Sequence, residues 1–378
     1  MLSRKIKKKS VVPRWQPYVF IAPFFIIYIA FSLFPVLYSF VISLYQWDGI
    51  GEKAYIGFQN YMTLFTKDNL FFKSVGNTFL IMSVPLPVLV IGGTMLASLI
   101  NSKFVRGKRL FQTINFLPYL TAPVAVGILF GLMFDQQNGV VNEALKSMGL
   151  LNEGLYWLKD GYLARIVVMI MCTWKYMGYY MVLLLAGITS ISSDIYEAAR
   201  IDGAGMVTTF FRITLPLMKN TLTFVIIQGM IGSLQLVEDP MTLLTGWISG
   251  GQSAVAGGPD RSSLTMMWYM YDTGFGTNMN YGYAASIAYA TFIIIAIFAF
   301  IINILLVRFR KITKLRSLFT TGHVQVQQAS TAYWLILFAL PGLLSAEENF
   351  VYRYHAVRIS HLFLSVLHDG YDGYPRNQ

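Results

Sequence analysis

Amide and carboxylate side chains interrupt an apolar stretch near residues 219–245, where they could exchange hydrogen bonds with a ligand. Gln228, Gln235 and Asp239 are separated by seven and four residues, a spacing that predicts one stripe along a helix. Glu238 lies beside that stripe. Polar groups at bilayer depth are costly and usually functional. The stripe is interpreted either as the lining of a pathway for a hydroxyl-bearing ligand or as polar contact between packed helices.

A second apolar stretch contains Lys175, with Tyr179 four residues later. The ring of Tyr179 could stack on a ligand or belong to ordinary aromatic packing. The ammonium group of Lys175 could pair with Glu238 or Asp239, or extend toward the membrane surface. These side chains are the candidate contributions of this stretch to the same pathway.

The residue types needed for catalysis do not form a recognisable group. All four histidines follow Arg316, and the single cysteine, Cys172, lies within an apolar run. A membrane-embedded enzyme needs clustered metal ligands or a nucleophile with its base. The phosphate-binding pattern G-x-x-x-x-G-K-[ST] is also missing from the sequence. We therefore expect no enzymatic activity, no metal site and no cofactor bound by this chain.

The composition indicates a membrane protein. Only 12% of the 378 residues are charged and 55% are hydrophobic, whereas a soluble domain carries about 25% charge. The net charge of +11 lies mainly at the chain ends and in short loops. That distribution is typical of cytoplasmic loops, so a nucleic-acid partner is not expected.

The apolar runs predict an all-α polytopic fold with six membrane-spanning helices. A bilayer core about 30 Å thick requires roughly 20 apolar residues per helix. Prolines within several runs predict kinks. The expected domains are a basic N-terminus at 1–17, a six-span domain at 18–316, and a tail at 317–378 to which no function is assigned. The expected spans are 18–44, 74–101, 110–134, 163–188, 219–245 and 281–307.

Basic residues predict that both ends of the six-span domain face the cytoplasm. Clusters without acidic residues precede the first run, separate the second from the third, and follow the sixth. The 135–162 loop instead carries acidic residues in excess, as expected of an outside loop.

The segment between the fourth and fifth runs predicts a compact helix-turn-helix on the cytoplasmic side. Ser193 or Asp194 can cap its first helix, and Gly203 with Gly205 can end it. A second short helix is expected to lead into the fifth run.

This segment resembles the signature loop of bacterial ABC-importer permeases. Further similarities, such as Phe58-Gln59-Asn60-Tyr61 and Gly282-Tyr283-Ala284-Ala285, resemble the carbohydrate-type branch, whose members carry oligosaccharides and glycerol-3-phosphate. The resemblance runs from about Tyr18 to Arg316. The loop residues that match the family pattern or its immediate surroundings are Glu197, Ala198, Ala199, Asp202, Gly203, Ile213, Leu215 and Pro216.

The resemblance implies a transport subunit whose energy comes from a separate protein. In the family this loop forms a coupling helix, which docks in a groove of a cytoplasmic ATPase that binds the ATP. Glu197 would supply a charged contact or cap, Gly203 the turn, and Ala198 with Ala199 a small flat face for the partner.

The resemblance also implies an assembly in the bacterial plasma membrane, with the N-terminus in the cytoplasm. One chain forms half of the pathway in this family. The expected partners are a second similar permease, an ATPase dimer, an external solute-binding protein, membrane lipid and a sugar. The loops 45–73, 135–162 and 246–282 either meet the binding protein or are solvated caps.

Two alternatives compete with a sugar importer of this family. A permease for glycerol-3-phosphate or another polyol would favour arginines along the pathway, and none lies deep in the spans, which favours a neutral sugar. An ion-coupled secondary transporter would predict repeated halves, broken helices and midplane carboxylates. The sequence shows no clear repeat, and the signature loop has no role in that class.

Overall fold

The computed structural model describes residues 15–102, 105–246, 255–276 and 279–320. The chain divides into one unit at residues 1–307 and another at 308–378. Of the second unit, only the C-terminal part of helix α16 (Tyr281–Thr320) is described. The expected tail therefore lies outside the described residues, apart from its first four positions.

Four helical stretches among the described residues are long and apolar enough to cross a membrane, and two bent helix pairs bring the number to six if each pair is one span. Since the described part of the chain holds two short strands beside these helices, the all-α polytopic prediction is confirmed. The four stretches are Tyr18–Ser43, Asn69–Asn101, Gly161–Thr189 and Tyr281–Ile302.

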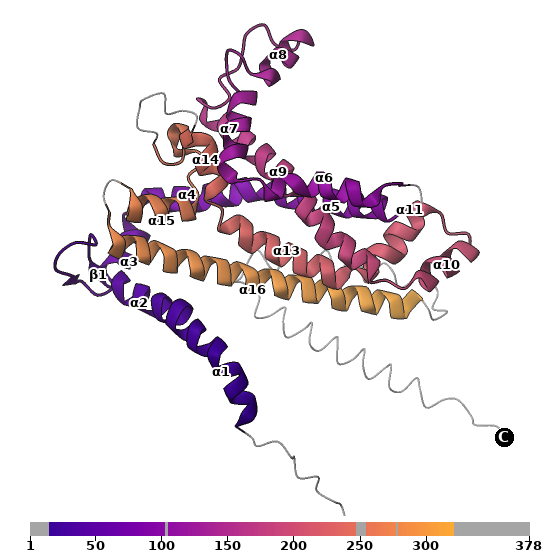
Figure 1. Cartoon of the computed structure of the whole chain (residues 1–378), viewed down its shortest axis with the longest axis horizontal. Coiled ribbons are helices and arrows are strands. Elements are labelled where there is room, and N and C mark those ends of the chain that lie inside the picture. Colours follow the sequence, from indigo (N-terminus) through magenta and orange to yellow (C-terminus); the bar gives the residue numbers. More distant parts are fainter. Residues whose placement is uncertain (1–14, 103–104, 247–254, 277–278, 321–378) are drawn as a thin grey trace, which may run out of the picture. The chain divides into compact units, whose positions relative to one another are not determined.

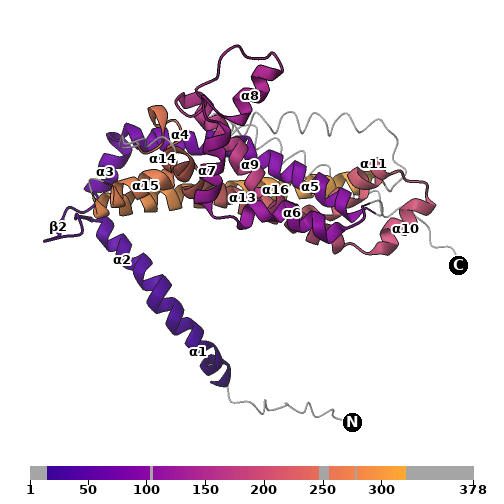
Figure 2. The same cartoon turned by 45° about the horizontal axis from the view of Figure 1, so that its top comes forward.

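The first stretch consists of α1 (Gln16–Tyr28), the π-helical turn η1 (Ile29–Leu33) and α2 (Phe34–Ser43). None of its most apolar window is buried by the rest of the chain. Figure 2 shows α1 diverging from the other helices. The first stretch contacts the rest of the chain at its α2 end, where the ring of Phe40 packs edge-on against that of Tyr289, with ring centroids 5.2 Å apart.

The second stretch, α4 (Asn69–Ser83) and α5 (Pro85–Asn101), begins five residues earlier than the expected 74. Asp68 caps α4 by accepting hydrogen bonds from the amides of Leu70 and Phe71, at 2.9 and 3.0 Å. Lys73 lies within this helix, and its ammonium group donates to the carbonyl of Asp260 at 2.6 Å.

The third run is bent by 93° between α6 (Lys108–Leu120) and α7 (Pro123–Met133). Proline restricts the residue before it to extended conformations. Ala122 accordingly has ψ 133°, and Pro123 starts the new helix, where its missing amide hydrogen costs nothing.

The fifth run is not the single helix expected at 219–245. Helix α13 (Lys219–Leu234) ends, and α14 (Glu238–Gly246) begins after a three-residue break. The ring of a proline clashes with the carbonyl four residues before it. Pro240 therefore prevents the helix from continuing through Leu236, whose carbonyl instead accepts the hydroxyl of Thr265 at 2.6 Å.

Helix α9 (Gly161–Thr189) lies at the centre of the packing. It packs most extensively against α5 and also against α6 (Figure 1). Gly178 lets α6 approach so closely that a Cβ atom there would lie 1.8 Å from the carbonyl oxygen of Asn115. Val167, Val168 and Met171 of α9 are fully buried.

Shorter elements lie at the two ends of the helices in the first unit. One end holds an antiparallel strand pair, in which Tyr45 faces Tyr55, and several short helices; the other end holds the segment between α9 and α13. The first group is β1 (Tyr45–Gln46), β2 (Ala54–Tyr55), α3 (Gln59–Thr66), η3 (Pro259–Arg261) and α15 (Met266–Phe275). Helix α8 (Val140–Ser147) belongs to neither end and projects beyond α7 (Figure 1). The second group is α10 (Ser193–Ile201), α11 (Met206–Thr209), η2 (Phe210–Thr214) and α12 (Leu215–Leu217).

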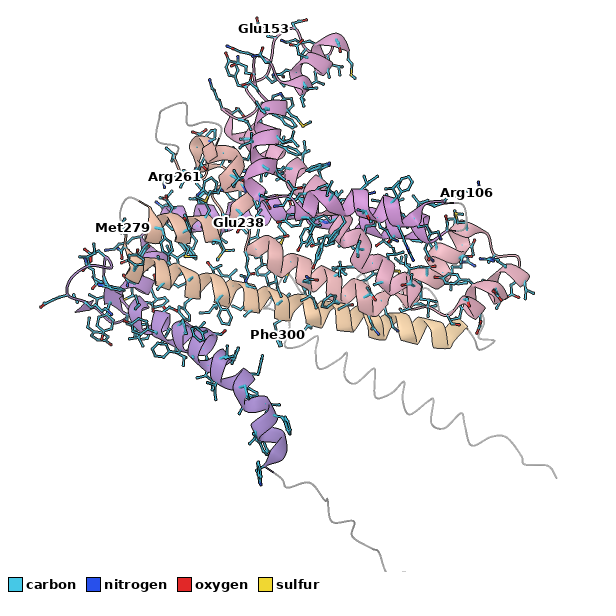
Figure 3. All side chains as sticks on the ribbon, in the orientation of Figure 1. Arg106, Glu153, Glu238, Arg261, Met279 and Phe300 are labelled. Atoms are coloured by element: carbon cyan, nitrogen blue, oxygen red, sulfur yellow. The ribbon has the colours of Figure 1, made fainter. Side chains whose placement is uncertain are left out.

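The labelled residues in Figure 3 show where three of the connecting segments lie. Arg106, in the basic loop before α6, lies at the same end as α10 and α11. Arg261 and Met279 lie toward the opposite end. Glu153 lies apart from both, on the projection that also carries α8.

Candidate functional site

The first part of the site is the segment at residues 192–217, named here the 192–217 loop. Ser192, rather than the expected Ser193 or Asp194, is the N-cap of α10, and its hydroxyl accepts the amide of Asp194 at 3.4 Å. The prediction of Ser193 or Asp194 as the cap was wrong because both residues already have helical conformation. Asp194 lies instead in the first turn, where a carboxylate is favoured by the helix dipole.

Gly203 ends α10 in a left-handed conformation, with φ 74°. The amide of Ala204 donates to the carbonyl of Ala199 at 2.9 Å, and that of Gly203 to Arg200 at 3.0 Å. These two bonds form a Schellman motif, which satisfies carbonyls left free at a helix end. Gly205, expected to help end this helix, is instead the residue before α11, with φ −68°.

The two halves of the 192–217 loop contact each other through a few buried side chains. Ala199 and Thr214 are only 6% and 4% exposed, and the Tyr196 hydroxyl lies 3.2 Å from that of Thr214. The expectation of a flat face formed by both Ala198 and Ala199 is therefore wrong for Ala199, because its side chain is buried. Ala198 remains exposed.

The remaining predicted loop residues lie mainly on the surface. Glu197, Asp202 and Pro216 are exposed, whereas Ile213 and Leu215 are half-buried. Within the described part of the chain, the Glu197 carboxylate has no hydrogen-bond or salt-bridge partner that would make it an internal cap.

The outer surface of the 192–217 loop is unusually apolar. Ile201 is 86% exposed and Val207 70% exposed. Exposed apolar patches of this kind mark interaction sites. The large apolar side chains exposed here are Ile195, Ile201, Met206, Val207, Phe211 and Leu217.

The second part of the site is the break in the fifth run, where the predicted stripe is interrupted. Gln235, the first residue of the break, and Glu238, the first residue after it, are exposed, whereas Asp239 is 1% exposed. Figure 3 shows Glu238 between α13 and α14. The prediction of one continuous stripe was wrong, because Pro240 breaks the helix on which it was drawn.

Lys175 pairs with Asp239, one of the two partners left open by the sequence. Its ammonium group donates to one carboxylate oxygen, and the hydroxyl of Tyr176 donates to the other at 2.7 Å. Lys175 is only 4% exposed. Because both charges are buried and matched, neither presents a free charge to a solute.

Tyr179 and Gln228 lie together on facing helices. The Gln228 amide donates to the Tyr179 hydroxyl, and the ring of Tyr119 stacks on Tyr179 with centroids 4.6 Å apart. Tyr119 was not among the residues predicted from the sequence. Its only signal was the adjoining Phe116-Leu117-Pro118, which places it before the bend between α6 and α7.

Two polar centres near the β1, α3 and α8 elements were also not predicted from the sequence. The carboxylate of Asp68 accepts the hydroxyls of Tyr269 and Tyr283, each at 2.6 Å. Burial, together with the bond to Asp68, raises the pKa of Tyr269 above its ordinary value. The fully buried Asn142 binds the amide of Leu155 and the indole of Trp157, at 3.1 and 2.8 Å.

Two hollows lie outside the 192–217 loop and the break. One, of about 1030 Å³, lies beside α9, and the other, of about 470 Å³, lies beside α3. The larger is mainly apolar and includes Arg165, whose guanidinium donates to the carbonyl of Ser262 at 2.7 Å. Neither hollow is lined by Tyr179, Gln228 or Gln235. Among the described residues, no group of three His, Cys, Asp or Glu side chains could hold a metal ion.

Comparison with known proteins agrees with this geometry. Residues 78–315 match the family described as "Binding-protein-dependent transport system inner membrane component". The lactose transport system permease protein LacF of Rhizobium radiobacter is 34% identical over 284 residues, which are 75% of this chain and 91% of that protein. The arabinooligosaccharides transport system permease protein AraP of Bacillus subtilis is 30% identical over 292 residues, covering 75% and 86% of the two chains.

A solved structure shows the same fold. A bacterial ABC transporter involved in the import of the acidic polysaccharide alginate superposes with a TM-score of 0.65 at 23% identity, over 78% of this chain and 96% of that one. The family match and the similarity to LacF define the class: this chain belongs to the inner-membrane permease components of binding-protein-dependent transport systems. It is a transport component of the multi-pass membrane type.

Proposed function

We propose that this chain forms half of the pathway by which an ATP-driven, binding-protein-dependent ABC importer carries a sugar or oligosaccharide. The observation that carries the proposal is the family match over residues 78–315, which includes the whole 192–217 loop. The names of the relatives, which include lactose and arabinooligosaccharide permeases, support a saccharide as the solute.

A neutral saccharide fits the described side chains better than an anionic solute. Lys175, beside the break, is neutralised by Asp239. Arg165 is occupied by the carbonyl of Ser262. Glycerol-3-phosphate, the alternative solute, would need a free cation to bind its phosphate. Gln228, Gln235 and the Tyr119–Tyr179 pair instead offer amides and ring faces, which suit hydroxyls and sugar rings.

The 192–217 loop is the proposed docking surface for a cytoplasmic ATPase dimer, which binds the ATP that this chain does not. Its exposed apolar side chains suit burial in a protein groove, with Glu197 at the surface for a charged contact. Switching a transporter between 1:99 and 99:1 populations requires about 5.5 kcal/mol of differential binding. That free energy would reach the spans through this loop.

Three further partners are proposed at other surfaces. The unburied α1–α2 stretch suits contact with membrane lipid and a second permease subunit. The described parts of loops 45–73, 135–162 and 246–282 are proposed to meet the external solute-binding protein. In this arrangement the basic loop holding Arg106 and the 192–217 loop face the cytoplasm of a bacterial cell, and the N-terminus lies on the same side.

Reconstitution of the complete complex tests this function. The chain is co-expressed with its partner permease, ATPase and binding protein, and uptake of radiolabelled neutral oligosaccharides into proteoliposomes is measured with and without ATP. Uptake that requires both ATP and the binding protein is expected. Uptake of glycerol-3-phosphate alone would favour the alternative solute, and an assembly that never retains an ATPase would refute the proposal.

A further inference from the structure

The break at residues 235–237 is held by polar side chains from neighbouring elements. The Thr265 hydroxyl donates to the carbonyl of Leu236 at 2.6 Å. After the break, the carboxylate of Asp239 is held by Lys175 and Tyr176 of α9. These contacts fix the backbone where the fifth run leaves its helical path.

The burial of Lys175 and Asp239 separates them from the exposed residues beside them. They are 4% and 1% exposed, so a passing solute cannot reach either charge without rearrangement. Gln235 and Glu238, in contrast, are exposed. Asp239 immediately follows Glu238 in the chain. The position at which Asp239 is held therefore determines the direction in which the exposed Gln235 and Glu238 side chains face.

Stability alone does not account for a buried ion pair. The desolvation of two charges offsets much of their attraction, and well-packed apolar replacements are often as stable as the original pair. Removing one partner is different, because the remaining charge is buried without compensation. A buried pair is therefore better suited to fix an orientation than to add net stability.

We propose that Lys175 and Asp239 are positioning residues that orient the break, so that Gln235 and Glu238 face the solute pathway. Neither residue contacts the solute in this mechanism. Tyr176 completes the arrangement by holding the second carboxylate oxygen of Asp239. The inference rests on the proposed import function for its transport readout, but its structural readout is independent of that function.

The structural readout uses the labelling of a single introduced thiol. Cys172 is the chain's only cysteine and is buried, so Gln235→Cys provides one accessible thiol at the break. The rate at which this thiol reacts with a membrane-impermeant maleimide is measured in two proteins. One carries Gln235→Cys alone, and the other carries Gln235→Cys together with Lys175→Met and Asp239→Leu. We expect the rate to change several-fold in the double variant, because the break turns when the pair is lost. An unchanged rate would overturn the proposal.

The transport readout separates positioning from assembly. Lys175→Met alone is expected to lower the yield of assembled complex, whereas the apolar double variant should restore the yield and the basal ATP hydrolysis. Sugar uptake by the double variant should still require a roughly tenfold higher solute concentration for half-maximal rate, at a similar maximal rate. Assembly together with a wild-type uptake curve would show that the pair only stabilises the fold.

A conservative variant covers the case in which the double variant fails to assemble. Asp239→Glu keeps both charges but moves the carboxylate by one methylene group. The complex should therefore assemble, and the solute concentration for half-maximal sugar uptake should differ from that of the unmodified complex. A wild-type curve in this variant would also overturn the proposal. Thr113→Val, at an exposed position of α6 outside the loops proposed to meet partners, provides the control and should change neither labelling nor uptake. Absence of sugar uptake by the unmodified complex would instead count against the proposed function.

Discussion

Gly203 is the residue at which backbone geometry limits substitution most clearly. Its φ of 74° is strained for any residue with a Cβ atom, although no other atom lies within 4 Å of where that Cβ would be. The left-handed conformation costs about 1–2 kcal/mol for an ordinary residue. Gly203→Trp is expected to abolish ATP-driven uptake while membrane insertion survives, because the bulky side chain would distort the end of α10 at the docking surface.

Gly205 provides the matched control for this substitution. A Cβ atom at Gly205 would likewise have no other atom within 4 Å, but the φ of −68° is ordinary. Gly205→Ala should therefore retain uptake and ATPase binding, and Gly203→Ala should be intermediate. Uptake into vesicles measures transport, and immunoblotting of the membrane fraction measures insertion. Normal uptake by Gly203→Trp would refute a role for this turn in coupling.

Gln235 is the exposed amide for which a direct solute contact is predicted. Gln235→Ala removes one hydrogen-bonding group worth about 0.5–1.5 kcal/mol. The solute concentration for half-maximal uptake should consequently rise by roughly two- to tenfold. Concentration-dependent uptake measures this effect, with Asn101→Ala, which removes an exposed amide at the C-terminal end of α5, as the control. Unchanged uptake of every sugar tested would remove Gln235 from the pathway.

At the scale of elements, local signals predicted the 192–217 loop better than the break. A cap, a left-handed glycine and an apolar period act within a few neighbouring residues, so the helix ending at Gly203 could be predicted directly. Pro240 predicted a kink. The carbonyl of Leu236, which loses its helical hydrogen bond at this kink, is instead bound by Thr265, 29 residues further along the chain, and no local signal indicates that partner. The choice between Glu238 and Asp239 as partner for Lys175, across 64 residues, likewise depends on how the broken helix packs.

The same limitation applies to the elements beside α3. Asp68 could be predicted as a helix cap because the amides it binds, those of Leu70 and Phe71, lie two and three residues further along the chain. Its bond to Tyr269 spans 201 residues, and no periodic pattern connects the two positions. Sequence patterns therefore predicted which helices form, whereas the polar contacts between distant elements became evident only from their packing.

Thr265 tests how firmly the break is fixed as an element. Thr265→Val keeps the shape of the side chain but removes both bonds of its hydroxyl, which donates to the carbonyl of Leu236 and accepts the amide of Trp268 at the start of α15. An unsatisfied buried polar group costs about 1–3 kcal/mol, so the purified protein should unfold at a lower temperature. Thr113→Val, at an exposed position whose hydroxyl donates to Arg109 within the same helix, should change the unfolding temperature little. Equal melting of the two variants would show that the break does not depend on Thr265.

At the scale of the whole molecule, basic and apolar side chains meet at one end of the first unit. The end with α10 and α11 combines the basic Arg106 loop with exposed Ile201 and Val207. An apolar patch in an aqueous compartment is unfavourable unless a partner covers it. Because basic loops are expected on the cytoplasmic side, this combination predicts that the ATPase binds at the α10 end.

Val207→Asp tests that prediction, because it places a charge on the 70% exposed side chain without disturbing a buried contact. Burial of a valine contributes about 1.5–3 kcal/mol, so the affinity for the ATPase should fall by roughly 10- to 100-fold. Co-purification of the ATPase with the detergent-solubilised permeases measures the loss. Val140→Asp, the same change at a 66% exposed valine of α8, should retain the ATPase, because α8 lies away from α10 and α11 (Figure 1). Equal retention by both variants would place the ATPase contact outside the 192–217 loop, whereas equal loss would indicate a general failure of assembly.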